Sequence, residues 1–427
     1  MEPGLLLFGT FFLLLLLNVP IVTSIGIAGM LCLWQFDLGV QVMAGNFYAN
    51  IAKFPLLAIP FFILAGFIMD RVGLSRGLVR FLNLLIGPVP GGLGLVAVAG
   101  CVFFGAISGT GPADTAAIGT IMIPAMVKRG YHVGFAAALV AAAATTDVLI
   151  PPSVAFVVYG VITEASIPRL FAAGVVPGLL MGMALVVPVL YISSRHGWGG
   201  ERWGTWAEIG RAGWDAKWGL MAPVIILGGI YGGIFTPTEA AVVAVAYGIV
   251  FGLFVERNLG LAALYETLCG AAVSTSVVMV VVAFAGLFSW TGSTMGIMDR
   301  ATAGLLGLTQ NPYLILLLLN GLLVIAGMLL DAISIYYVFL PILMPLMKQF
   351  DWDPVWFGVM MTVNLAIGTV TPPVAVNLYV ASNISGAPIE EVSRWVLPFF
   401  FALLAALLLV TYFPALSLWL PDALGVK

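Results

Sequence analysis

Leu149-Ile150-Pro151-Pro152-Ser153 interrupts one long apolar segment of this chain, and Thr371-Pro372-Pro373-Val374 interrupts another, 221 residues later. Proline lacks the backbone N–H that a helix needs, so a proline pair at membrane depth frees backbone groups that must find other partners. Interrupted segments at corresponding places in two halves of a membrane protein indicate the binding site of a transporter.

Other prolines repeat with the same offset of 221 residues. They precede and follow the two breaks, at Pro124 and Pro177 in the first half and at Pro345 and Pro398 in the second. Proline makes up only 25 of the 427 residues, so this agreement indicates an internal repeat. We therefore expect a first repeat over 1–192, a cytoplasmic linker over 193–216 and a second repeat over 217–427.

The composition is that of an all-α polytopic membrane protein. Apolar residues make up 62% of the chain and charged residues 8%, and the apolar runs reach the length of membrane-spanning helices. The only histidines, His132 and His196, lie in polar connections, and the three cysteines lack metal-type spacing. These features argue against an enzyme, a cofactor or a metal other than a coupling ion, and we expect no nucleic-acid partner.

Apolar runs and helix breakers predict five spans in each half. They lie at about 4–18, 20–36, 54–70, 133–163 and 170–192, and at about 217–235, 237–255, 270–290, 354–384 and 396–420. The fourth span of each half is the broken helix. Before it we expect a re-entrant helical hairpin, at about 92–128 and about 312–349, although a single irregular crossing is the alternative. Shorter stretches read as interfacial helices, near 38–53, 258–269 and 296–310.

Basic residues favour the hairpin interpretation. With two hairpins, eleven Lys and Arg share one side of the membrane and five share the other, so the richer side is cytoplasmic and both termini lie outside. Five spans per half is an odd number, which gives the two halves opposite orientations. The predicted fold is therefore an inverted repeat of five spans plus one hairpin per half.

Four carboxylates fall in apolar stretches without a nearby Lys or Arg. They are Asp114, Asp147, Glu239 and Asp331. A carboxylate at membrane depth must be neutralised by a proton, a cation or hydrogen bonds. Glu239 starts a helix near the outer surface, so we expect it to be structural. The other three lie at a hairpin turn or just before a proline pair.

We expect each hairpin turn to meet the break of the following helix at mid-membrane. Half-helix ends there would present carbonyl and hydroxyl oxygens to a cation and N–H groups to an anion. The first sodium site is predicted at Ser108, Gly109, Thr110, Asp114, Thr145, Thr146 and Asp147. The second is predicted at Gly327, Asp331, Ser334, Gly368, Thr369 and Thr371. Residues close to the substrate are predicted to be Pro151, Pro152, Ser153, Pro372, Pro373 and Asn377. The alternative for any single Ser or Thr is a hydrogen bond to its own backbone, and for Gly close packing.

Several motifs resemble a known family. They are Phe104-Gly105-Ala106-Ile107-Ser108-Gly109, Ala116-Ala117-Ile118-Gly119-Thr120-Ile121-Met122-Ile123-Pro124, Leu149-Ile150-Pro151-Pro152-Ser153, Thr236-Pro237-Thr238-Glu239-Ala240-Ala241, Val363-Asn364-Leu365-Ala366-Ile367-Gly368 and Thr371-Pro372-Pro373-Val374. Together they cover essentially the whole chain. They resemble the large membrane subunit, of the DctM type, of tripartite ATP-independent periplasmic (TRAP) transporters in the ion transporter superfamily.

The resemblance implies a sodium-driven, elevator-type importer in the cytoplasmic membrane of a bacterium or archaeon. A fixed scaffold would hold a moving transport domain built from the hairpins and broken helices. The implied partners are a small four-span membrane subunit and a periplasmic solute-binding protein that delivers a small carboxylate-type solute. The chain departs from the family pattern at Asp114 and Asp147, where many relatives carry small or uncharged residues. Proton coupling, or carboxylate transport without a binding protein, is the alternative.

Overall fold

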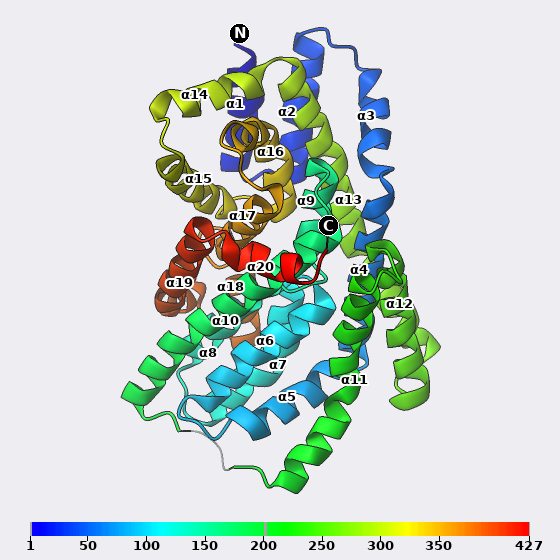
Figure 1. Ribbon diagram of the computed structural model, residues 1–427, viewed down its shortest axis with the longest axis vertical. Coiled ribbons are helices and arrows are strands. Elements are labelled where there is room, and N and C mark those ends of the chain that lie inside the picture. Colours follow the sequence, from blue (N-terminus) through cyan, green and yellow to red (C-terminus); the bar gives the residue numbers. More distant parts are fainter. Residues whose placement is uncertain (1, 200–202, 427) are drawn as a thin grey trace.

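The computed structural model describes residues 2–199 and 203–426, and these residues form helices and no strand. Within the described residues, twenty α-helices follow one another (Figure 1). In the part of the chain that the structure describes, six helical segments are long and apolar enough to cross a membrane: Phe54–Arg71, Ile167–His196, Pro237–Val255, Leu261–Thr294, Ala332–Gln349 and Ile389–Tyr412. The predicted all-α polytopic class is confirmed.

The first half contains ten α-helices. They are α1 (Pro3–Leu16), α2 (Ile21–Gln35), α3 (Val42–Ile51), α4 (Ala58–Arg71), α5 (Leu74–Ile86), α6 (Gly92–Ser108), α7 (Gly111–Lys128), α8 (Val133–Ala143), α9 (Val154–Thr163) and α10 (Ile167–His196). Two 3-10 segments accompany them, η1 (Phe54–Leu57) before α4 and η2 (Ala144–Thr146) after α8.

The second half contains ten more. They are α11 (Trp206–Tyr231), α12 (Pro237–Val250), α13 (Leu261–Thr294), α14 (Ile297–Leu308), α15 (Pro312–Gly327), α16 (Ala332–Gln349), α17 (Pro354–Gly368), α18 (Val376–Ser385), α19 (Ile389–Tyr412) and α20 (Ala415–Ala423). A π-helical segment, η3 (Phe251–Val255), extends α12.

Helix bounds repeat with the offset of the prolines. Adding 221 to the bounds of α7, Gly111–Lys128, gives 332–349, which are the bounds of α16. The contacts repeat as well: α9 packs on α16 and α17, while its counterpart α18 packs on α7 and α8. Each broken helix thus places its second part against the hairpin and broken helix of the other half.

Both predicted hairpin stretches form two helices joined by a short turn. α6 and α7 are separated by Gly109 and Thr110, and α15 and α16 by residues 328–331. Gly109 has φ +64°, a left-handed conformation that glycine adopts without steric cost. The proline pairs lie in the non-helical segments between α8 and α9 and between α17 and α18.

Three details differ from the predicted elements. The stretch 258–269 is not a separate interfacial helix, because most of it forms the start of α13. The linker 193–216 is largely helical, because α10 continues to His196 and α11 begins at Trp206. α5 falls in a stretch where the sequence predicts no span. Its leucines at 74, 78 and 82 are buried on one face, which explains an amphipathic helix too polar to count as a span.

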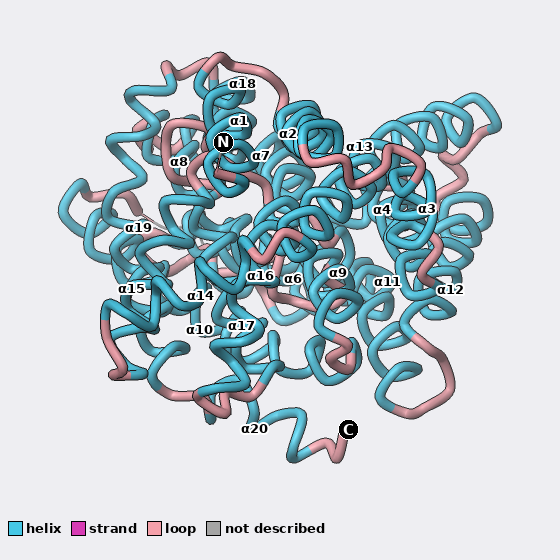
Figure 2. The backbone as a smooth tube through the Cα atoms, turned by 90° about the horizontal axis from the view of Figure 1, so that it is seen from above, coloured by secondary structure: helices cyan, strands magenta, loops and turns pink. Residues whose placement is uncertain are grey.

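The helices form two groups around the interrupted segments. α3, α4, α11, α12 and α13 gather on one side of the molecule, and α8, α15 and α19 on the other (Figures 1 and 2). α5 packs against α11 of the first group and against α6, which in turn packs on α8 of the second group.

Candidate functional site

The turn of the first hairpin touches the first break through its backbone. A Cβ added at Gly109 would lie 2.6 Å from the carbonyl oxygen of Pro152. A Cβ added at Gly105, in the last turn of α6, would lie 2.8 Å from Cα of Asp147. Only glycine permits so close an approach of two backbones, which explains these residue types. The predicted meeting of hairpin turn and broken helix is therefore present in the first half.

Two carboxylates are enclosed at this contact. Asp114, in the first turn of α7, and Asp147, after η2, are both 0% exposed. The Ser108 hydroxyl donates a hydrogen bond to Asp114 Oδ1. Asp114 Oδ2 and both oxygens of Asp147 have no hydrogen-bond partner among the described residues. Among the described residues, no Lys or Arg forms an ion pair with either carboxylate. A group other than a basic side chain must therefore compensate their charge.

The hydroxyl groups near the first break are tied to local backbone. Thr145 Oγ1 donates to Ala142 O at 2.7 Å, and Thr146 Oγ1 donates to Ala143 O at 2.8 Å. Ser153 Oγ donates to Val148 O at 2.5 Å and accepts from Phe156 N–H at 3.3 Å, so it caps α9. These bonds give each hydroxyl a structural role, and each oxygen keeps a lone pair that could face a cation.

The second hairpin meets the second break through a pair of glycines. A Cβ added at Gly368 would lie 2.5 Å from the carbonyl oxygen of Gly327, and one added at Gly327 would lie 3.1 Å from Cα of Gly368. Val374 N–H donates to Met328 O at 3.2 Å, which extends the contact from the hairpin turn to the residue after Pro373.

Asp331 and Ser334 lie at the start of α16. Asp331 Oδ1 accepts from the N–H groups of Ile333 (3.0 Å) and Ser334 (3.1 Å), and Ser334 Oγ donates to Asp331 Oδ2 at 2.5 Å. Asp331 is exposed and acts as an N-cap. In the described part of the chain no hydrogen bond joins this pair to Thr369 or Thr371. Those two hydroxyls donate instead to the carbonyl groups of Ala366 and Ile367, both at 2.7 Å.

Asn377 connects the two candidate ion sites. Its side chain is 0% exposed, and its Nδ2 donates to Thr369 Oγ1 at 3.2 Å and to Ala141 O of α8 at 3.4 Å. A Cβ added at Gly111, the first residue of α7, would lie 3.1 Å from the same Nδ2. The Asn377 Oδ1 atom is buried without a hydrogen-bond partner among the described residues. Asn377 therefore touches the first hairpin and the second break at once.

The two breaks differ in exposure. Pro151, Pro152 and Ser153 are buried, whereas Pro372 and Pro373 are exposed. The residues predicted to lie close to the substrate are therefore not in equivalent environments.

A buried polar chain beside the second site was not among the predicted site residues. Asn364 Nδ2 donates to Asn320 Oδ1 at 2.7 Å, and Asn320 Nδ2 donates to Thr411 Oγ1 at 2.9 Å. Asn364 lies one helical turn before Gly368 and keeps its Oδ1 atom unpartnered within the described residues. An asparagine within the apolar stretch Val363-Asn364-Leu365 was the available signal, since amides are costly in lipid unless paired.

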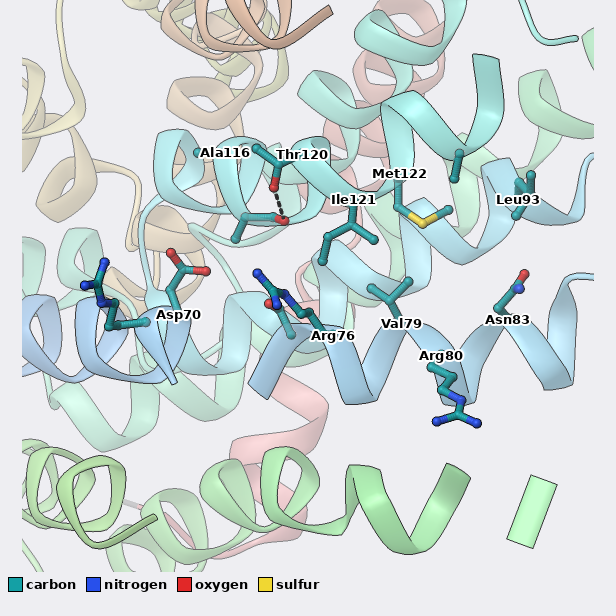
Figure 3. Close-up of a pocket in the computed structure, with 14 residues that line it drawn as sticks. Asp70, Arg76, Val79, Arg80, Asn83, Leu93, Ala116, Thr120, Ile121 and Met122 are labelled. Carbon is teal, nitrogen blue, oxygen red and sulfur yellow. Dashed lines mark hydrogen bonds between the residues drawn. The ribbon is translucent and has the colours of Figure 1, made fainter. Parts of the chain in front are cut away.

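A cavity of about 1050 Å³ lies beside the first hairpin, between α5 and α7 (Figure 3). Its polar lining includes Asp70 and Arg71 at the end of α4 and Ser75, Arg76, Arg80, Asn83 and Thr120. The apolar part of its wall comes from residues such as Val79, Ala116 and Ile121.

Comparison with known proteins gives consistent results. The family description "Tripartite ATP-independent periplasmic transporter, DctM component" matches residues 8–416. The chain is 46% identical to the isethionate TRAP transporter permease protein DctMQ of Oleidesulfovibrio alaskensis, over 98% of this chain and 66% of that protein. It thus spans just under two thirds of that relative. It is also 40% identical to the C4-dicarboxylate TRAP transporter large permease protein DctM of Pseudomonas aeruginosa, over 95% of each chain.

Solved structures share the fold at low sequence identity. The Alcanivorax borkumensis YdaH transporter superposes with a TM-score of 0.66 at 15% identity, covering 97% of this chain and 98% of that one. Neisseria gonorrhoeae MtrF gives a TM-score of 0.61 at 15% identity, covering 89% and 85%. The near full-length match to the family and to its large permeases settles the assignment. The chain belongs to the DctM component family of tripartite ATP-independent periplasmic transporters.

Proposed function

We propose that this chain is the transporting subunit of a sodium-coupled importer of small organic anions, working by an elevator movement in a bacterial inner membrane. Its partners would be a small four-span permease subunit and a periplasmic solute-binding protein, each on a separate chain. Membership of a tripartite transporter family supports the presence of partners. The name DctMQ of one relative, which is longer than this chain, is consistent with a second permease segment in some members.

The enclosed carboxylates carry the proposal of a coupling cation. Asp114 and Asp147 are fully buried, and three of their four oxygens have no hydrogen-bond partner among the described residues. A cation bound between the first hairpin and the first break would neutralise them and would use the hard oxygen ligands that sodium prefers. Ser108, Gly109, Thr110, Thr145 and Thr146 would supply hydroxyl or carbonyl oxygens.

A second cation is proposed at the meeting of the second hairpin and second break. The C-terminal ends of α15 and α17 lie backbone to backbone at Gly327 and Gly368. Helix C-termini carry partial negative charge and free carbonyl oxygens, which favour a cation. Thr369 and Thr371 would add oxygens, with Asp331 and Ser334 on the hairpin side.

The proposed solute is a small carboxylate, within a wider class of organic anions. Relatives are named for C4-dicarboxylate, 2,3-diketo-L-gulonate and sialic acid, and one for isethionate, which is a sulfonate. All four carry an anionic group that N–H groups at half-helix ends can bind. The region around Pro151, Pro152, Ser153, Pro372, Pro373 and Asn377 is the proposed place for it.

Uptake into proteoliposomes tests the coupling ion. The chain is reconstituted with its small subunit and binding protein, and uptake of succinate, isethionate and sialic acid is measured under a sodium gradient and under a proton gradient alone. We expect uptake of at least one solute to require sodium. Uptake that follows the proton gradient without sodium would overturn the proposal.

Proton coupling is the second candidate, and a specific observation favours it. Asp114 and Asp147 are both buried at the contact of the first hairpin with the first break, and neighbouring carboxyls can share a proton. Transport by the chain and its small subunit without a binding protein is tested by omitting that protein from the assay.

A further inference from the structure

The cavity between α5 and α7 is distinct from the hairpin turn. Thr120 of its lining lies nine residues after Gly111, where α7 begins. At about 1.5 Å per residue this places the cavity about 14 Å along the helix from the proposed ion site. The cavity is open to the surface on the face that carries Arg71, Arg76 and Arg80, which the charge distribution predicts to be cytoplasmic.

The charge of the lining is mainly positive. Three arginines line the cavity, with Asp70 as the single carboxylate among the lining residues. Arg71 is paired with Glu266 at 3.1 Å, and Arg80 lies 4.0 Å from Asp215. Two of the three guanidinium groups are thus directed to partners on α13 and α11.

Arg76 differs from the other two arginines. It forms no ion pair within 4.0 Å among the described residues, and Asp70 is the neighbouring carboxylate whose charge interacts with it. Figure 3 shows its side chain in the space between α5 and α7, below Thr120 and Ile121. A guanidinium presents donors in a planar fork that matches carboxylates and sulfonates.

We propose that this cavity is a second anion site, in which Arg76 holds the transported carboxylate or sulfonate after it leaves the hairpin turns for the cytoplasm. This rests on the proposed transport of organic anions. The site has the volume for a small organic acid, whose apolar part would lie against Val79, Ala116 and Ile121. Clefts lined by one sign of charge raise the local concentration of opposite ions.

Charge-selective thiol labelling tests the site without requiring transport. Thr120→Cys is introduced into a Cys269→Ala background, because Cys32 and Cys101 are buried. Inside-out vesicles are treated with an anionic methanethiosulfonate (ethylsulfonate) or a cationic one (ethyltrimethylammonium). Rates are normalised to those of a free thiol. We expect the anionic reagent to be favoured by about 3–10-fold at low salt, with the preference falling as salt is added.

Charge variants identify the group responsible. Arg76→Gln should bring the ratio of the two rates close to one, Arg76→Lys should largely keep it, and Asp70→Asn should raise it. Arg195→Gln removes a charge on the same predicted face outside the cavity and should leave the ratio unchanged. Millimolar succinate or isethionate should slow labelling with Arg76 present but not in Arg76→Gln. Ala116→Cys replaces Thr120→Cys if the latter does not fold.

Two results would overturn the proposal. One is equal labelling by both reagents in the parent, and the other is a preference that Arg76→Gln leaves intact. Absence of uptake of all three anions in the proteoliposome assay would overturn the proposed transport and leave the labelling ratios standing, so the two failures are distinguishable.

Discussion

Asp331 has one observed role and one proposed role. Its carboxylate caps α16 and also lies at the turn where the second cation is proposed. Asparagine is as good an N-cap as aspartate, because its side-chain oxygen accepts the same N–H groups. Substitution by asparagine therefore removes the charge while keeping the helix start.

Asp331→Asn is expected to lower uptake and to raise the sodium concentration for half-maximal uptake by about tenfold, the effect of losing about 1.4 kcal/mol of ion binding. Initial rates across a sodium titration in proteoliposomes measure this. Asp331→Ala is the comparison, since it also removes the cap and should cost about 1 kcal/mol of stability. Unchanged transport in Asp331→Asn would mean that Asp331 is not a ligand.

Asp147 offers a stability readout of ion binding. Both of its oxygens are buried without hydrogen-bond partners within the described residues, so the ionised form is costly in the absence of a cation. Asn is close to isosteric with Asp and neutral.

Asp147→Asn is expected to unfold at the same or a higher temperature than the parent in sodium-free buffer, and to lose the part of the stabilisation by sodium that comes from the first site. That stabilisation is about 2.7 kcal/mol when sodium exceeds its dissociation constant 100-fold. Thermal unfolding in detergent with sodium or choline chloride tests this, and Glu239→Gln, whose carboxylate lies in an exposed capping box, is the control. A sodium response as large in Asp147→Asn as in the parent would contradict the assignment, whereas a reduced response is what the second site would leave.

At the scale of elements, the second hairpin is held on the broken helix by a contact that excludes any side chain. The backbones of α15 and α17 meet at Gly327 and Gly368. A methyl group at Gly368 would force the hairpin away from the break, because the nearest atoms belong to the backbone and cannot rotate aside.

Gly368→Ala is expected to destabilise the protein by about 3 kcal/mol and to abolish uptake. Gly321→Ala in α15 is the matched control, since a Cβ there meets nothing within 4 Å. It should retain uptake and, through better helix propensity, at least equal stability. Yield after detergent extraction, thermal unfolding and uptake of both variants compare the two positions. Equal behaviour would show that the contact is not required.

The sequence predicts elements better than contacts. The proline pairs and Gly109 mark the breaks and the first turn, because their backbone requirements are local. The sequence does not predict α5, because its buried leucines alternate with arginines, which lowers its mean hydropathy below that of a span. The bond from Asn377 to Ala141 joins residues 236 positions apart, and no local pattern reveals such a pair. Thr145 and Thr146 are predicted as ligands from their type and from their place before the first proline pair. The structure shows the bonds to the local backbone that the sequence leaves as the alternative, made within the 3-10 geometry of η2.

At the scale of the whole molecule, orientation follows from the distribution of charge. If both hairpins are re-entrant, eleven of the sixteen Lys and Arg residues are predicted to share the side that carries the linker 193–216. The inverted repeat and the outside position of both termini depend on this assignment.

Fusion reporters test the orientation. Green fluorescent protein inserted after Gly197 is expected to fluoresce, and alkaline phosphatase at the same place to be inactive. At the C-terminus the pattern should be reversed, because fluorescent protein exported in unfolded form stays dark. The two reporters control for each other's expression. Fluorescence at both places would mean that an even number of crossings separates Gly197 from the C-terminus. The second half would then not be inverted relative to the first.

The four glycines at the hairpin contacts, Gly105, Gly109, Gly327 and Gly368, have a consequence for how such a protein can evolve. A carbonyl oxygen belongs to every amino acid, so no codon change can delete it, and these positions tolerate no larger residue. An ion-binding site made of backbone oxygens there would therefore change little during evolution. Adaptation to a new nutrient would proceed instead through side chains elsewhere and through exchange of the binding protein, which leaves the energy source of uptake untouched.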